Sequence, residues 1–403
     1  MRLFLLLLIF SLIPQQALFA QLNVSITPEI STSSFLIPLQ LSLSEAEFNF
    51  AQRTSVLHLN HPQNRFFIQS YNRADITMVT EISNFSYMGE AISLKVGRDY
   101  IVSGPSQING PLFSSFAPSL DHFAFHFFRS HNVDFEYRLI RLDNRQHLLG
   151  TFNRWMYYRR ISLQLAERFE LGFKDIVLAT GVQRGIDLNY LNPAAIFQLE
   201  QLHGHVEAGT PGQNNDNQLM GFDISWSVSP NLQIYGDFIL DEFQIDIADR
   251  EHIQDVFGLT IGLEKNYPGS ELVLEYYLAS PWLYTNGGMF TNVEIQGIPL
   301  GYRAPQSHGV SVMYQHQLVW GQMMLQMSSC QIGEQTVLTD WDSVGNRIPL
   351  YDFDHNWQSE FDLSFYFEHN KYIDHIRLTY DLLDSEGLYF VVGFNLFTYN
   401  SGK

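Results

Sequence analysis

Few residues of this chain have the types and spacing that enzyme chemistry requires. A serine hydrolase needs a nucleophile beside a histidine, and Ser307 with His308 is one of the few such pairs in the sequence. Adjacent residues of a strand face opposite sides of a sheet, so this pair is poorly placed to cooperate. The sequence has no nucleophile elbow, phosphate loop or dinucleotide fingerprint, and nothing singles out a catalytic pair among its 42 carboxylates. We therefore expect no catalytic residue and no enzyme activity.

Two segments carry side chains that bind metals in other proteins. His203 and His205 flank a glycine without a third ligand in sequence, which makes a zinc site a weak hypothesis. Residues 340–346 cluster side-chain oxygens but lack the spacing and closing glutamate of an EF-hand loop, so loose Ca²⁺ binding stays open. The single cysteine, Cys330, excludes an internal disulfide and suits burial as a small apolar group. We expect no metal and no cofactor.

The charge balance excludes one large class of partners. The 403 residues include 23 basic and 42 acidic side chains, for a net charge of −19. Nucleic acids are held largely by basic surfaces, so we expect no nucleic-acid partner. Charged residues make up only 16% of the chain, whereas 45% are hydrophobic and 14% aromatic. A chain of this composition is not disordered, and its charged fraction is low for a soluble domain.

The first residues have the pattern of a secretory signal. Met1 and Arg2 precede an apolar run from Leu3 to Ile13, which Pro14 ends, and Ala20 suits the position before a cleavage site. The run is too short to span a membrane as a helix, and no later stretch approaches 18 apolar residues. We expect residues 1–20 to be a signal peptide cleaved near Ala20, and residues 21–403 to form a single domain.

Alternation of apolar and polar residues dominates the rest of the chain. Apolar side chains recur at every second position for up to eleven residues, which is typical of strands with one apolar and one polar face. These stripes begin at Phe222, Phe257, Val310, Phe361, Ile376 and Leu388. A secreted sandwich would bury the apolar face, whereas a membrane barrel would turn it toward lipid.

Three features favour the membrane barrel over the sandwich. The stripes have the length of tilted membrane strands. Their polar faces carry charges such as Asp223 and Glu264, and aromatics such as Trp226 and Trp320 stand at strand ends. Short turns alternate with long polar connections at 103–121, 185–220, 279–308 and 333–358. We therefore predict an all-β transmembrane antiparallel barrel of about 16–18 strands in the bacterial outer membrane, with long extracellular loops.

Several segments between residues 90 and 310, in their order and content, resemble the Wzi-like capsule-assembly family of outer-membrane barrels. They are Lys95–Ile101, Asp187–Pro193, Asn214–Gly221, Ile234–Phe243, Leu274–Tyr277 and Ile298–Tyr302. The chain departs from the family where Ser103 precedes Gly104 instead of a tryptophan–glycine pair. It also departs at residues 21–60, which read as strand and loop with at best a short helix near 44–53, where the family has a helical plug.

The resemblance implies a monomeric barrel that binds or organises capsular or extracellular polysaccharide at the cell surface. Acids and amides can pair with sugar hydroxyls, arginine with carboxylates and aromatic rings with sugar faces. The candidate polysaccharide-binding residues are Arg98, Asp187, Asp216, Asn217, Asp241, Glu275, Tyr276, Trp282 and Tyr302. Two alternatives stay open: a substrate-selective channel with an acidic lumen, and an ion-pair network that only holds the wall in register. The expected partners are outer-membrane lipid and polysaccharide.

Overall fold

The computed structural model places most of the chain after residue 20. The described residues are 21–26, 28–30, 35–58, 71–73, 76–130, 132–148, 150–192, 215–242, 255–285, 290–339, 357–367, 373–381, 387–394 and 397–400. The expected signal peptide, His203 with His205, and residues 340–346 lie outside them. No helix within the described ranges is long and apolar enough to cross a membrane.

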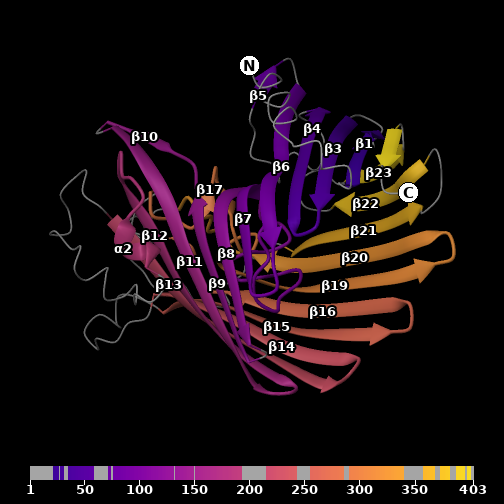
Figure 1. The fold of residues 1–403 in the computed structure, drawn as a ribbon. Helices are drawn as coiled ribbons and strands as arrows, with labels where there is room; N and C mark the ends of the chain where they lie inside the picture. Colours follow the sequence, from indigo (N-terminus) through magenta and orange to yellow (C-terminus); the bar gives the residue numbers. More distant parts are fainter. Residues whose placement is uncertain are drawn as a thin grey trace.

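The described residues form one large antiparallel sheet (Figure 1). In chain order its strands are β1 (Gln21–Ile26), β2 (Glu29–Ile30), β3 (Phe35–Glu45), β4 (Phe48–His58), β5 (Tyr71–Arg73), β6 (Ile76–Met88), β7 (Ile92–Asp99), β8 (Leu120–Ser130), β9 (Val133–Arg141), β10 (Arg145–His147), β11 (Gly150–Ala166), β12 (Phe169–Val182), β13 (Asn215–Ser229), β14 (Leu232–Glu242), β15 (Val256–Tyr267), β16 (Ser270–Ala279), β19 (Ser307–Leu318), β20 (Gly321–Ile332), β21 (Trp357–Phe367), β22 (Ile373–Asp381), β23 (Gly387–Phe394) and β24 (Phe397–Asn400). A separate hairpin joins β17 (Glu294–Ile295) to β18 (Ile298–Pro299), and α2 (Leu188–Leu191) is a single helical turn.

The sheet closes into a barrel because its first and last strands pair. β1 pairs with both β3 and β24, and β2 pairs with both β3 and β23. β1 with β2, and β23 with β24, therefore each act as one interrupted strand, while β5 and β10 are three-residue additions beside β6 and β11. Among the described residues, about 18 strands thus form the wall. This confirms the predicted all-β barrel and its strand number.

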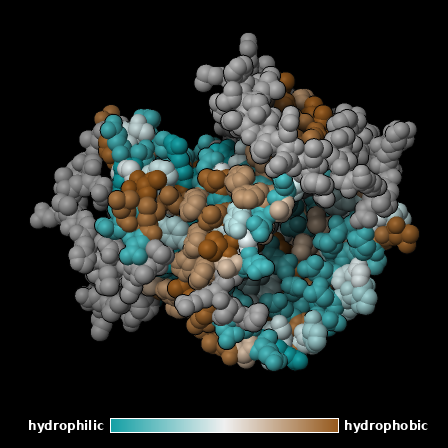
Figure 2. Space-filling model, viewed as in Figure 1, coloured by the Kyte–Doolittle hydropathy of each residue, from teal (hydrophilic) through white to brown (hydrophobic). Residues whose placement is uncertain are grey.

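The alternation seen in the sequence separates the two faces of the wall. On β13, Phe222 and Ile224 are 49% and 40% exposed, whereas Asp223 between them is 2% exposed. Asp223 faces the lumen opposite Asp237 of β14, and Phe222 meets Phe173 of β12 on the outer face. In Figure 2, hydrophobic residues gather over β8, β9 and β11, and hydrophilic ones over β15–β20. The apolar face points outward, as a membrane barrel requires.

The two ends of the barrel differ. Two- or three-residue turns join β3 to β4, β6 to β7, β11 to β12 and β13 to β14 at one end, called here the short-turn end. At the other end the chain enters long connections, of which the structure describes residues 100–119, 183–192, 280–285 and 290–306. Exposed aromatics stand near the short-turn end, where Trp320 stacks on Phe367 at 5.0 Å and Trp226 lies close to the β13–β14 turn. This asymmetry agrees with the prediction.

The prediction of mostly strand and loop at residues 21–60 is confirmed within the described ranges, and only the short helix allowed near residues 44–53 is absent. The segment near residues 44–53, read as at best a short helix, is the hairpin between β3 and β4. Glu45 pairs with Phe48 across a turn in which Ala46 has a φ of +49°. Strand pairing on both sides of β4, with β3 and β6, gives each backbone group a partner and overrides the weak local helix preference.

Candidate functional site

Two long connections enter the lumen and build a core there. Two loops carry apolar side chains that pack against inward residues of the wall: the crossing loop (residues 100–119) and the hairpin loop (the described residues 280–285 and 290–306). The loop members of this core are Ile101, Leu112, Phe113, Trp282, Leu283, Tyr284, Val293, Ile295 and Leu300, and the wall members include Met156, Tyr158, Ile176, Leu178, Leu219, Ile239 and Tyr277. The lumen beside β8–β16 is therefore filled by chain.

A single carboxylate fixes the middle of the crossing loop. Glu275 on β16 is fully buried and accepts hydrogen bonds from the backbone N–H groups of Gln107, Ile108 and Asn109 at 2.7, 3.2 and 2.6 Å. The hydroxyl of Tyr235 donates to the same carboxylate at 2.7 Å. Consecutive N–H groups that converge on an anion form a cradle of partial positive charge, and here the wall supplies the anion.

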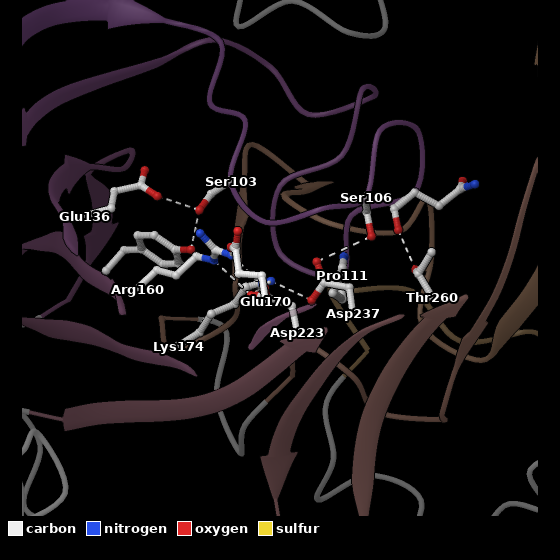
Figure 3. Close-up of polar contacts among 12 residues, drawn as sticks. Ser103, Ser106, Pro111, Glu136, Arg160, Glu170, Lys174, Asp223, Asp237 and Thr260 are labelled. Carbon is white, nitrogen blue, oxygen red and sulfur yellow. Dashed lines mark hydrogen bonds and ion pairs between the residues drawn. The ribbon is translucent and has the colours of Figure 1, made fainter. Parts of the chain in front are cut away.

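Charged wall residues lie beneath the start of the crossing loop (Figure 3). Ser103 donates to Glu136 at 2.7 Å, and Ser106 donates to Asp237 at 3.4 Å. Asp237 is balanced by Lys174, whose ammonium lies 2.5 Å from its carboxylate. Lys174 also lies 3.5 Å from Asp223. The residues come from β9, β12, β13 and β14, so this ion-pair network ties four strands to one loop.

Aromatic rings join the hairpin loop to the wall. The ring of Tyr302 stacks on Tyr277 with centroids 4.8 Å apart, and its hydroxyl lies 2.9 Å from the hydroxyl of Thr260. The wall makes room through a glycine, because a Cβ at Gly258 would lie 2.6 Å from the Tyr302 ring. Tyr284 donates its hydroxyl hydrogen to the carbonyl of Pro111, which links the two loops directly.

A buried arginine anchors the far end of the hairpin loop. Arg154 on β11 is fully buried and donates to the carbonyls of Phe290 and Asn292 and to the carboxylate of Asp143. It also lies 3.1 Å from Glu294 of the β17–β18 hairpin. Burial raises the pKa of the Glu294 carboxyl, although Arg154 opposes this shift. The guanidinium of Arg154 therefore pairs with carboxylates and also donates hydrogen bonds to backbone carbonyls of the loop.

A second cluster lies outside the lumen, where α2 meets the outer face of the wall. Asp187 caps α2 by accepting from the N–H of Asn189 at 3.0 Å. Arg184 binds Asp187 at 3.2 Å and also pairs with Asp216. Tyr190 donates to Asp216 at 2.7 Å, and burial together with this carboxylate raises the pKa of the phenol. Two of the predicted residues, Asp187 and Asp216, thus share one arginine.

The other predicted residues divide between the lumen and the outer face. Asn217, Asp241, Glu275, Trp282 and Tyr302 are all buried in the lumen. Asn217 donates to the carbonyl of Thr291, and Asp241 accepts from the backbone N–H of Tyr284 at 2.7 Å. Trp282 and Tyr302 are only 3% and 1% exposed, so the expectation that external loops display them is not met. Their rings instead complete the core that fills the lumen.

Arg98 and Tyr276 occupy the outer face. Arg98 forms a two-pronged ion pair with Asp121 at 2.7 and 2.6 Å. It shares the outward face of β7 with Val96, which is 54% exposed. Tyr276 is half-exposed and its ring lies 6.2 Å from that of His308. The predicted residues therefore do not converge on one sugar site.

Several important residues were missed by the prediction. Arg154, Arg160 and Lys174 stand in phase on the inward faces of β11 and β12, where a charge must find a partner across the lumen. Their position at every second residue, on the polar face of each strand, is the sequence feature that could have identified them. Cys330 is buried in the lumen core, as predicted for a small apolar side chain. Within the described ranges, no group of three potential ligands suits a metal ion.

Neither a family model nor a curated protein matches the sequence. Among solved structures, the chain is similar to Wzi of Escherichia coli, an outer-membrane protein involved in group 1 capsule assembly and described as a carbohydrate-binding β-barrel. The TM-score is 0.63 and the identity 12%, over 97% of this chain and 88% of the other. The outer-membrane protein OpdK of Pseudomonas aeruginosa gives a TM-score of 0.48 at 10% identity, over 94% of this chain and 97% of the other. The shared property is the fold: this chain is built as an outer-membrane β-barrel.

Proposed function

We propose that this protein resides in the bacterial outer membrane and binds or organises capsular or extracellular polysaccharide at the cell surface, without catalysing a reaction. The observation that carries the proposal is the filled lumen. Glu275 holds three consecutive backbone N–H groups of the crossing loop, and both loops share an apolar core with the wall. A channel needs a continuous wet path, whereas a surface-binding barrel does not.

The wall satisfies the physical demands of this location. Its outer face is largely apolar, its lumen face carries charges such as Asp223 and Glu275, and exposed aromatics stand near the short-turn end. The solved structure with a TM-score of 0.63 is a carbohydrate-binding barrel, which supports the same role here. The family resemblance of the sequence supports it independently. A single filled barrel needs no second copy to complete its core, which favours a monomer.

Segment 183–192, which follows β12 at the long-connection end and packs against the outer face, is the part of the described surface best suited to sugar. Gln183, Asn189 and Asn192 are exposed there and offer amide donors and acceptors for hydroxyl groups. Arg184 behind them is held by Asp187 and Asp216, so the segment has a fixed backbone. A fixed segment loses little conformational freedom when it binds a ligand. Asp187 and Asp216 thus serve the site by positioning it.

The decisive experiment measures cell-bound and released polysaccharide in the parent strain, a deletion strain and complemented strains. The proposal predicts that deletion releases polysaccharide while total synthesis stays constant, and that the wild-type gene restores attachment. Unchanged attachment in the deletion strain would overturn it. Planar-bilayer recordings of the purified protein address the channel alternative, because a filled lumen predicts little conductance, while a large steady conductance would favour a channel.

A further inference from the structure

Four residues form one row across the outer face of neighbouring strands. The strand register places Arg98 of β7 opposite Asp121 of β8, Asp121 opposite Arg141 of β9, and Arg141 opposite Trp155 of β11. Neighbouring strands lie about 4.8 Å apart, so the two arginines stand roughly 10 Å from each other with the carboxylate between them. This row, Arg98–Asp121–Arg141–Trp155, is called the rim row below.

On β7 and β8, the rim row marks the upper limit of the apolar wall. Below it on the same face, Val96 and Phe123 are 54% and 41% exposed. On β7 and β9 the chain leaves the wall just above the row, where the crossing loop follows Asp99 and residues 142–148 follow Arg141, whereas β11 continues above Trp155 to Gly150. The row therefore stands at the end of the barrel that carries the long connections. In the proposed orientation, this is the level of the external headgroups.

Arg141 differs from the arginines of the lumen. Arg138, Arg154 and Arg160 each contact a carboxylate in the lumen. Arg141 is exposed, and no carboxylate of the described residues lies within ion-pair distance of its guanidinium. Its guanidinium carbon instead stands 5.9 Å from the centre of the Trp155 ring. An exposed arginine over an aromatic ring, held in place beside an apolar face, is arranged to meet an external anion.

The neighbouring segment adds interfacial character to the rim row. The indole N–H of Trp155 donates to the carbonyl of Arg184 at 3.2 Å, which fixes the ring against segment 183–192. In that segment Leu188 is exposed and Ile186 is half-exposed, although both are apolar. Tryptophan, arginine and exposed aliphatic side chains that lie close together are typical of a membrane interface. Bulk charge cannot attract an anion to a chain of net charge −19, so the attraction must be local.

We infer that the rim row binds the phosphorylated headgroup of an anionic glycolipid in the external leaflet. Arg141 contacts a phosphate group, Arg98 adds a second positive charge fixed by Asp121, and Trp155 packs against the sugar or glycerol part of the headgroup. The acyl chains lie along Val96 and Phe123. This inference rests on the membrane location proposed above and is independent of polysaccharide binding.

The test uses purified protein in phosphatidylcholine nanodiscs with or without diphosphorylated lipid A. Native mass spectrometry of the released protein counts the lipid A molecules that stay bound. The variants are Arg141→Gln and Arg141→Glu, and the matched control is Arg168→Gln, which changes an exposed arginine in a turn at the opposite end. Dephosphorylated lipid A and inorganic phosphate serve as the other ligands.

The proposal predicts that Arg141→Gln lowers lipid A retention about fivefold, the size expected for one arginine at an anionic lipid surface. Arg141→Glu should lower it further, and Arg168→Gln should leave it unchanged. Equal retention in wild type and Arg141→Glu would overturn the proposal, as would equal retention of dephosphorylated lipid A. The proposal would also be overturned if inorganic phosphate, at the same concentration as lipid A, prevented lipid A from binding. That result would indicate a general anion site. Insertion into lipid-A-free nanodiscs reports separately on the proposed membrane location.

Discussion

The carboxylate of Glu275 and the backbone N–H of Asn109 are joined by a 2.6 Å hydrogen bond across 166 residues of sequence. The bond connects a strand of the wall to the middle of the crossing loop. Thr260 donates to the carbonyl of the same asparagine at 2.5 Å, so both backbone groups of Asn109 are held by side chains of the wall. A loop fixed in this way behaves as part of the barrel.

Glu275→Ala should release the crossing loop. The substitution leaves three backbone donors and the Tyr235 hydroxyl buried without their acceptor, and each lost partner of this kind costs about 1–3 kcal/mol. We expect the variant to unfold at a lower urea concentration in lipid vesicles and to conduct more current in a planar bilayer. Water that enters the opened lumen can hydrate the unpaired donors and can also carry ions. The lower stability and the higher conductance therefore have the same cause.

Glu264→Gln is the matched control for that experiment. Glu264 contacts the same loop through the side chain of Gln107 at 2.6 Å, but it binds no backbone group of the loop and is not buried. We expect its unfolding midpoint and conductance to stay close to those of the wild type. If both variants conduct alike, the Glu275 contacts do not close the lumen.

Gly258→Val should disturb the hairpin loop through crowding alone. The added Cβ lies 2.6 Å from the Tyr302 ring and 3.0 Å from Leu283, and both of these side chains are buried. Overpacking of this kind costs about 1–3 kcal/mol, which chemical unfolding in vesicles would measure. Gly236→Ala on the outer face is the control, because its nearest neighbour is the exposed Ile224 at 3.3 Å. Equal losses would indicate a general effect of glycine replacement.

The fold could be predicted because the wall has a simple period. The alternation of Phe222, Asp223 and Ile224 predicts which face of β13 is turned toward lipid. The register of β13 with its neighbours follows, because a shift by one residue would turn the apolar side chains to the other face. The strand number followed from chain length and turn spacing for the same reason. What failed locally was the segment near residues 44–53, where pairing with β3 and β6 decided the outcome.

The candidate site could not be predicted to the same degree, since it depends on where loops go. Nothing in the residues around Trp282 or Tyr302 indicates that the hairpin loop turns inward. An exposed aromatic on a loop and a buried one look alike until a partner such as Gly258 is known. Glu275 is a predicted polysaccharide-binding residue, but in the structure it accepts hydrogen bonds from the backbone of residues 107–109, which no side-chain pattern reveals.

Arg154→Ala should destabilise the hairpin loop more than Arg154→Lys. The alanine variant removes the fully buried donors to the carbonyls of Phe290 and Asn292, and each buried group that loses its partner costs about 1–3 kcal/mol, while Arg145 still pairs with Glu294. Lysine keeps the charge but cannot reach the carbonyls of Phe290 and Asn292 with a planar fork. Urea unfolding monitored by tryptophan fluorescence would rank the three proteins. An alanine variant as stable as the lysine variant would contradict the anchoring role.

Asn189→Ala tests the proposed sugar surface without disturbing the fold. Its exposed side chain makes no contact that supports α2, since its N–H bond to Asp187 comes from the backbone. We expect cells with this variant to release more polysaccharide while the amount of barrel in the membrane stays constant. Asn231→Ala, in the short turn after β13, is the control at the opposite end. If cells with either variant release the same amount of polysaccharide, segment 183–192 does not bind polysaccharide.

The one cysteine of the chain can report whether the loops leave the lumen. Cys330 is 4% exposed and belongs to the lumen core, next to Gly309 and the Tyr277 ring on which Tyr302 stacks. A maleimide in the aqueous phase should therefore label the wild type slowly, and label the urea-unfolded protein at once. Glu275→Ala should label faster than the wild type at the same temperature, because loosening either loop opens the core around the thiol. The variant could conduct more current and still be labelled at the same rate as the folded wild type. In that case the current passes by a route that leaves the core around Cys330 intact.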